Sequence, residues 1–274
     1  MTSLERAAPR AAWAEPATPV RFLEDTWTVA QAELRKLAHD PTEVATRAVQ
    51  PILWLVVFGQ VMAQTRAIPT GNLSYVDFLA PGILAQSALF SAIFFGIAVI
   101  WERDLGVLHK YLVSPASRTA LVGGKALAGG LRSLVQAVVV YLVAFVIGIN
   151  LRLEVTAIAG VAVVVVLGAA VFATFSLIVA CLVRTRERFM GIGQLLTMPL
   201  FFASNAIYPI ALMPPWLQVV AHLNPLTYQV DALRALMIEG GPSMYPVWLD
   251  MAVLAGTLVA LVAIGSRLYP RLAE

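Results

Sequence analysis

The chain has 274 residues, of which 59% are hydrophobic and only 13% are charged, and its net charge is +3. An average soluble domain has roughly a quarter of its residues charged, and a soluble core of this length could not bury so much apolar side chain. The composition therefore excludes a soluble protein and predicts an integral membrane protein. The chain has one cysteine, so it can form no disulfide within itself.

Two segments precede the first long apolar run. Residues 1–19 are rich in Ala and Pro without a continuous apolar stretch, so we expect a disordered tail and no signal peptide. Over residues 20–47, apolar side chains recur at spacings of three and four, which predicts one amphipathic helix. We expect this helix to lie in the cytoplasmic membrane interface, and a helix docked on a soluble partner is the alternative. The apolar stripe includes Leu23, Trp27, Leu34 and Leu37.

Six apolar segments follow, each long enough or nearly long enough to cross about 30 Å of hydrocarbon. They predict an all-α integral membrane protein with six transmembrane helices in a single domain over residues 48–274. The six segments are residues 48–65, 78–101, 131–149, 155–183, 190–211 and 246–266.

The basic residues predict which ends of the spans face the cytoplasm. With both termini inside, the cytoplasmic segments hold 15 of the 19 Lys and Arg residues, and the outer segments hold only Arg66, Arg152 and Arg234. Cytoplasmic loops of membrane proteins carry such an excess of positive charge, so we expect an N-in, C-in topology. The cytoplasmic segments are then residues 1–47, 102–130, 184–189 and 267–274.

The segment between the second and third spans, WERDLGVLHKYLVSPASR, is charged and interrupted by Gly and Pro. Its leucines fall on one face of a helix, roughly opposite Arg103 and Lys110, and Pro115 ends that helix. We expect a short amphipathic cytoplasmic helix of the kind that docks in a groove of a soluble protein. RTRER, residues 184–188, is the second cytoplasmic loop.

The outer segment before the last span is divided by prolines into short apolar pieces. WLQVVAHL can form about two helical turns, and LTYQVDALRALMIE about three and a half, closed by Gly240. Each piece is too short to span a bilayer but apolar enough to enter it. We predict a re-entrant helical hairpin on the outer side. Two amphipathic helices lying on the outer surface are the alternative.

One sequence feature resembles a nucleotide site but lacks its required residues. GGKA, residues 123–126, would need a Gly five positions before its Gly-Lys pair and a Ser or Thr directly after it. Thr119 and Ala126 occupy those positions, so we expect no phosphate site. The small residues around it instead predict close packing between helices.

Polar groups that could support other chemistry are few. His39, His109 and His222 are far apart, so we expect no metal site. Asp77 and Asp250 fall near the outer ends of spans, where we expect water to reach them, and no series of carboxylates crosses the membrane. We place Arg132 about three turns into its helix, where it can extend to the inner interface. Contact with a lipid phosphate or an anionic substrate at the inner mouth is the alternative.

Two motifs carry a resemblance to a known family. ERDLGVLHKYLVSPASR resembles the signature region of type-2 ATP-binding cassette (ABC) exporter permeases, which show Glu-Arg, then Gly, then Leu-Leu-x-Ser-Pro. NPLTYQVDALR, residues 224–234, resembles the outer segment that precedes their last span. The resemblance covers the chain from about residue 20 and is greatest to the drug-resistance and nodulation-type branch, with the polysaccharide-exporting branch second. Val107 and His109 depart from the family pattern, in which Thr and Glu are frequent.

The resemblance implies a permease subunit in a bacterial inner or plasma membrane that pairs with itself and with two copies of a separate ATPase subunit. ATP and Mg would be held by that subunit, so the chain itself would be no enzyme and would hold no cofactor. The implied substrate is a hydrophobic or amphipathic molecule such as a drug, lipid or glycolipid, and not a nucleic acid. The residues implied in ATPase coupling are Glu102, Arg103, Asp104, Gly106, Leu108, Lys110, Leu112, Ser114, Pro115, Arg184, Arg186 and Arg188. Those implied in the outer gate are Pro214, Pro215, Trp216, Asn224, Pro225, Tyr228, Asp231 and Arg234.

Two other classes of protein are rivals. A secondary carrier would be expected to show ionisable groups at mid-membrane and repeats of inverted hydropathy, and the sequence displays neither. A membrane-embedded lipid-modifying enzyme would need converging polar side chains at one depth, which the spans lack.

Overall fold

The computed structural model describes the chain in separate stretches, and within them it is all-helical. The only pairing of β type in these stretches is an isolated antiparallel bridge between Leu151 and Ile238. The described residues are 24, 26–28, 30–31, 49–66, 68–106, 117–183 and 185–269.

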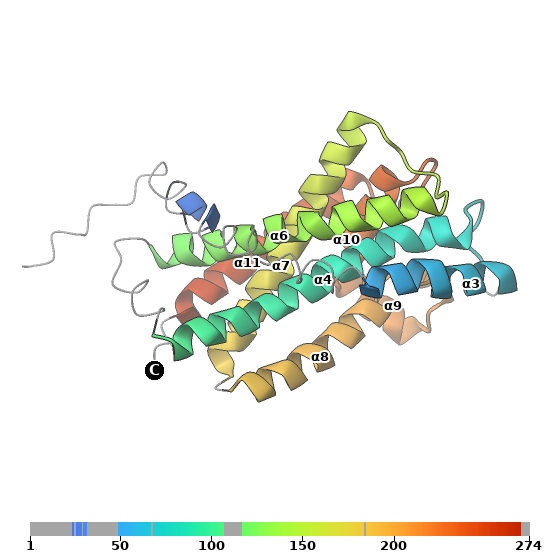
Figure 1. Cartoon of the computed structure of the whole chain (residues 1–274). Coiled ribbons are helices and arrows are strands. Elements are labelled where there is room, and N and C mark those ends of the chain that lie inside the picture. Colours follow the sequence, from blue (N-terminus) through green and yellow to red (C-terminus); the bar gives the residue numbers. More distant parts are fainter. Residues whose placement is uncertain are drawn as a thin grey trace, which may run out of the picture.

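Four helices are long and apolar enough to cross a membrane within the described stretches. In Figure 1, α4 and α6 run along the length of the molecule and α7 crosses them, and α7 lies against each of the other three. At 1.5 Å per residue, helices of 22 to 30 residues measure about 33–45 Å, which exceeds the hydrocarbon thickness. The protein is therefore an integral membrane protein. The four are α4 (Tyr75–Asp104), α6 (Arg118–Val146), α7 (Val155–Leu182) and α11 (Val247–Leu268).

The predicted first and fifth spans are shorter. The first is helical over Val49–Thr65 and contains a π-helix, η1 (Trp54–Gly59), followed by α3 (Gln60–Thr65). The fifth is α8 (Arg186–Phe202), a helix of 17 residues in which Pro199 lies near the end. Both fall short of the length of a full candidate span. The predicted end of the fifth span at residue 211 is wrong, because the chain leaves the helix after Phe202.

The apolar segment predicted as the third span, residues 131–149, overlaps the later part of a longer helix. α6 starts at Arg118, where the Ser117 hydroxyl accepts a hydrogen bond from the Ala120 amide at 3.2 Å and caps the helix. Gly130 lies where α6 meets α7, and a Cβ at this position would be 2.5 Å from the carbonyl oxygen of Val166. The small residues of this region therefore permit close packing of two helices, as predicted.

The predicted outer hairpin consists of two helices in different environments. α10 (Pro225–Met237) packs against α4, α7 and α11 and is mostly buried. α9 (Pro215–Leu223) follows the short 3-10 helix η2 (Ile210–Leu212) and leaves an apolar stripe exposed. That stripe consists of Trp216, Val219, Val220 and Leu223.

Of the amphipathic segment predicted at residues 20–47, the structure describes only residues 24, 26–28 and 30–31, which are helical. Trp27 is half exposed and Ala30 is buried. Leu23, Leu34 and Leu37 lie outside the described residues, as does the predicted tail at residues 1–19.

Candidate functional site

The candidate site lies at one end of the bundle, where α4 and α7 end and α6 and α8 begin (Figure 1). We call it the basic end, because Arg103, Arg118, Arg186 and Arg188 lie there. Glu102, Arg103 and Asp104 form the last turn of α4. The prediction that these three belong to a separate cytoplasmic helix is therefore wrong, since α4 continues three residues beyond the expected end of the span.

The chain leaves α4 through a turn at Leu105 and Gly106. Gly106 has φ +70°, a left-handed conformation that glycine adopts without steric cost, which explains the Gly at this position. The remaining predicted coupling residues fall outside the described residues: Leu108, Lys110, Leu112, Ser114, Pro115 and Arg184.

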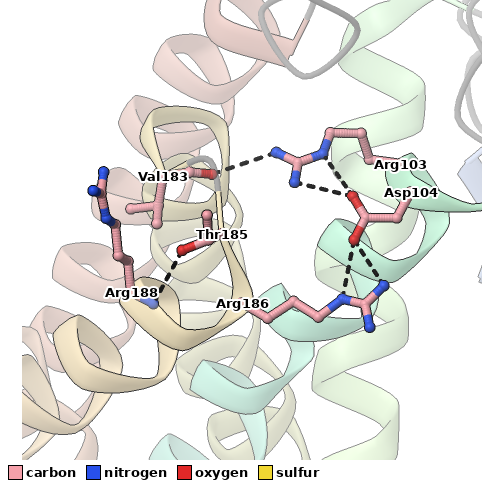
Figure 2. A network of polar contacts seen from close by, with 6 residues as sticks. All are labelled: Arg103, Asp104, Val183, Thr185, Arg186 and Arg188. Carbon is pink, nitrogen blue, oxygen red and sulfur yellow. Dashed lines mark hydrogen bonds and ion pairs between the residues drawn. The ribbon is translucent and has the colours of Figure 1, made fainter.

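Asp104 is the centre of an ion-pair network (Figure 2). The Arg186 guanidinium donates to Oδ2 of Asp104 from Nη2 at 2.7 Å and from Nε at 3.0 Å. Arg103 donates to Oδ1 from Nη2 at 3.1 Å and from Nε at 3.2 Å. Its Nη1 also donates to the carbonyl oxygen of Val183 at 3.4 Å. The network therefore joins the end of α4 to the connection between α7 and α8.

Arg186 makes a second contact with α4. Its guanidinium carbon lies 3.8 Å from the centroid of the Trp101 ring, a cation–π geometry. One side chain of α8 thus contacts two residues in the last turn of α4. Arginine suits this position because its planar group can stack on a ring while it donates two hydrogen bonds to one carboxylate.

Arg188 differs from Arg186 in both contact and direction. Figure 2 shows its side chain pointing away from Asp104, and it is exposed. Its backbone amide donates to the Thr185 hydroxyl at 3.4 Å, which caps α8. Arg188 is therefore exposed at the surface, whereas Arg186 makes contacts within the chain.

Glu102 faces the interior of the bundle. Its Oε2 accepts a hydrogen bond from Nζ of Lys125 at 2.6 Å, and the two side chains are 10% and 2% exposed. The Glu102 carboxylate therefore lies inside the bundle and not on its surface, and its role in ATPase coupling stays a prediction. Lys125 was missed as a site residue, although a lysine within an apolar helix signals a buried partner.

Arg132 lies in the interior of α6, about 21 Å along the helix from its first residue, which is close to four turns and one turn deeper than expected. Its guanidinium carbon is 5.8 Å from the centroid of the Phe95 ring. The Nζ atom of Lys125 lies at the same distance from this ring. Phe95 is thus flanked by two cations of α6.

The predicted outer residues connect elements to one another. Asn224 caps α10 by accepting from the Leu226 amide at 3.0 Å. Its Nδ2 donates to the carbonyl oxygens of Leu200 at 2.7 Å and Ala203 at 2.8 Å. Pro225 is the first residue of α10, where its missing amide proton costs nothing. Asn224 therefore fastens the end of α8 to the start of α10.

Asp231 and Arg234 are both buried on α10. The Asp231 carboxylate accepts from the amides of Met244 at 2.8 Å and Tyr245 at 3.0 Å and from the Ser243 hydroxyl at 2.9 Å. Arg234 donates to the carbonyl oxygen of Asn205 at 2.7 Å. Its guanidinium carbon also lies 3.9 Å from the centroid of the Phe78 ring, so this residue joins α10 to α4.

Tyr228 belongs to a polar cluster that includes two residues not predicted, His222 and Tyr245. Tyr228 donates from its hydroxyl to the His222 carbonyl oxygen at 2.7 Å, and its ring stacks on Tyr245 with centroids 5.4 Å apart. The Tyr245 hydroxyl lies 2.7 Å from Nδ1 of His222. Burial, with nearby acidic and phenolic groups, raises the pKa of Tyr245, so this hydroxyl stays protonated and can donate to the imidazole.

Among the proline-rich residues that precede α10, Pro214 caps α9 and Pro215 is its first residue, while Trp216 is exposed. These residues therefore start and orient α9.

Asp77 and Asp250 are not in contact with water, which corrects the expectation for both. Asp77 is buried and accepts from the backbone amide of Asn150 at 3.3 Å and from its Nδ2 at 3.1 Å. Asp250 is fully buried, and no described residue donates a hydrogen bond to its carboxylate. The sequence alone could not reveal this burial, because the covering residues come from distant segments.

The fold and the site define a multi-pass, all-helical membrane protein whose basic end is tied together by ion pairs. The chain belongs to the ABC-2 type transporter family, whose model matches residues 24–238. Among its relatives, the ycf38 protein of Cyanophora paradoxa is 29% identical over 218 residues, which cover 78% of this chain and 74% of that protein.

Two further relatives are transport permeases by name. The daunorubicin resistance ABC transporter permease protein DrrB1 of Streptomyces coeruleorubidus is 24% identical over 84% of this chain and 81% of its own length. The inner membrane transport permease YadH of Escherichia coli is 24% identical over 66% of this chain and 70% of its own length.

Proposed function

We propose that the chain is the permease subunit of an ATP-driven exporter that moves a hydrophobic or amphipathic substrate, such as a drug, lipid or glycolipid, out of the cytoplasm or inner leaflet. The observation that carries the proposal is the Asp104 network. It lies at the base of the loop that resembles the ATPase-contacting region of type-2 exporters, and it connects that loop to α8. The drug-resistance name of DrrB1 supports a drug-like substrate.

Energy for transport comes from a separate ATPase subunit, of which two copies act on a homodimer of this chain. ATP and Mg bind to that partner. The exposed groups at the basic end, Leu105, Gly106 and Arg188, form part of the docking surface.

The topology is N-in and C-in, in a bacterial cell membrane. The distribution of charge in the described helices supports this orientation. Arg103, Arg118 and Arg186 lie at the basic end, whereas Arg66 and Arg152 lie at the opposite end of the bundle. The positive-inside bias places the basic end in the cytoplasm.

The membrane domain has six crossings. A bilayer core of about 30 Å requires a helix of roughly 17–25 residues. α8 meets the lower limit with 17 residues, and the irregular chain after Phe202 extends it. The helical segment Val49–Thr65 has a comparable length. Both leave apolar side chains exposed, as expected of surfaces that face lipid or a second copy of the chain.

Movement of the ATPase shifts α8 relative to the core. α7 packs against α4, α6, α10 and α11, so these helices form a rigid unit. α8 packs mainly on α4, and its ends are held by Arg186 at the basic end and by Asn224 at the other. A displacement at the basic end is thereby transmitted along α8 to α9, which moves against the fixed α10 as a re-entrant gate.

Arg132 contacts an anionic group of a lipid or substrate at the inner mouth. Its half-buried position over Phe95 supports this role, because an arginine at membrane depth is retained only where it finds a counter-charge or a polar path.

The test is co-purification of the chain with its ATPase, followed by ATP hydrolysis measured against drugs, lipids and a lipid-linked glycan. We expect a stable complex whose ATP hydrolysis rises with one class of substrate. Stimulation by the glycan alone would assign the chain to polysaccharide export. Failure of any ATPase subunit to associate would refute the proposed function.

A further inference from the structure

The buried ion pair between Glu102 and Lys125 joins the two helices that flank the cytoplasmic loop. Nζ of Lys125 lies 2.6 Å from Oε2 of Glu102, and neither side chain has appreciable contact with solvent. Breaking such a buried pair by removing one of its partners is strongly unfavourable. The pair therefore holds α4 and α6 in one fixed register.

A second contact repeats this register two helical turns away. Moving from Glu102 along α4 by two turns reaches Phe95, and moving from Lys125 along α6 by two turns in the opposite chain direction reaches Arg132. The Arg132 guanidinium carbon lies 5.8 Å from the Phe95 ring centroid. Residues two turns apart lie on the same helix face, so both contacts belong to one antiparallel interface between α4 and α6, which we call the seam.

The contacts of α4 with α8 differ in burial. The side chains of Arg186 and Asp104 are 33% and 35% exposed. Water and salt screen an exposed ion pair, so little free energy is needed to separate its two side chains, whereas separating a buried pair costs more. The ion pair between α4 and α6 is thus harder to break than the ion pair between α4 and α8.

We propose that Lys125 is a positioning residue for coupling. By pairing with Glu102 near the end of α4, it makes α4 and α6 a single lever that ends at the loop between them. Displacement of the loop then moves both helices together against α8. The coupling part of this inference depends on the proposed function, whereas the rigid seam between α4 and α6 does not.

The test measures distances between spin labels on the full-length chain in lipid nanodiscs, in a Cys181→Ala background. Labels at Phe94 and Thr119, both exposed, report the α4–α6 distance. Labels at Phe94 and Met190, which is also exposed, report the α4–α8 distance. We expect a narrow α4–α6 distribution that Lys125→Met broadens. The charge swap Glu102→Lys with Lys125→Glu should restore it, and Glu102→Gln should broaden it less than Lys125→Met.

The matched control is Glu154→Gln, which breaks the exposed pair of Arg152 and Glu154 at the opposite end of the bundle. We expect it to leave the α4–α6 distribution unchanged. An unchanged distribution in Lys125→Met, or equal broadening in Glu154→Gln, would overturn the inference. If Lys125→Met does not fold, the charge swap and Glu102→Gln decide the question.

A second measurement adds the ATPase. Lys125→Met should retain the ATPase but lose about tenfold or more of substrate-stimulated ATP hydrolysis, since breaking a buried ion pair shifts an equilibrium by at least that factor. With nucleotide, the wild-type α4–α8 distance should change and the α4–α6 distance should not. Full coupling in Lys125→Met would overturn the inference. Failure of the ATPase to bind wild type would refute the proposed function instead, and the nanodisc distances would still decide whether the seam is rigid.

Discussion

Replacement of Asp231 by Asn should release the loop that connects α10 to α11. The carboxylate accepts hydrogen bonds from Ser243 Oγ at 2.9 Å, from the Met244 amide at 2.8 Å and from the Tyr245 amide at 3.0 Å. A hydrogen bond to a charged group contributes about 1.5–3 kcal/mol. Asn keeps one acceptor oxygen but turns an NH2 group toward an amide donor, so we expect a loss of about 2–4 kcal/mol.

The assay is hydrogen exchange of the backbone amides of Met244 and Tyr245 in detergent or nanodiscs. A loss of this size should speed their exchange by about 30- to 1,000-fold, because local opening follows the free energy that holds the loop. Asp250→Asn is the matched control, since Asp250 is equally buried but accepts no hydrogen bond from a described residue. It should leave both amides protected. Unchanged exchange in Asp231→Asn would refute the assigned role.

Three further predictions concern other contacts. Gly82→Ala should destabilise the protein by about 1–3 kcal/mol in thermal unfolding, because the added Cβ would lie 2.3 Å from the Ala206 carbonyl oxygen. Its control is Gly191→Ala, where a Cβ would have no neighbour within 4 Å. In the same assay this variant should be neutral or more stable by up to about 1 kcal/mol. Asn224→Ala should lower the free energy of unfolding by about 2–3 kcal/mol, because the protein loses a helix cap and two further hydrogen bonds. Thr185→Ala removes an exposed helix cap and should lower it by about 1 kcal/mol at most. Asp104→Asn should leave the unfolding temperature unchanged but reduce substrate-stimulated ATP hydrolysis, and equal hydrolysis in variant and wild type would contradict a role for the Asp104 network.

Local chemistry made the outer helices predictable. Pro215 and Pro225 each occupy the first position of a helix, and the glycines at 240 and 241 follow the end of α10. These prolines and glycines lie within a few residues of the helix ends that they determine, so the helix boundaries could be predicted closely.

The helix of the third span was expected to begin about three turns before Arg132, near its observed start at Arg118, although hydropathy alone places the span at residues 131–149. Hydropathy disfavours residues 118–130, because this stretch contains glycines, Lys125 and Arg118. In the structure, close packing on α7 and the partner at Glu102 make that stretch helical and largely buried. Both causes are contacts with residues distant in sequence, which no local pattern records.

The candidate site was predictable in its residues but not in its geometry. The charged residues after the second span were identified from the resemblance. Their separation into a buried pair at Glu102 and an exposed network at Asp104 depends on which side of α4 each residue faces. That orientation is set by the packing of α6 and α8 on either side of it.

The most direct test of the central claim is transport by the purified chain and its ATPase in proteoliposomes. We expect a fluorescent amphipathic drug or lipid to move across the bilayer only when the chain, the ATPase, ATP and Mg are all present. We also expect Asp104→Asn to reduce this movement while the complex remains assembled. Transport by the chain without the ATPase, driven by an ion gradient, would contradict the account.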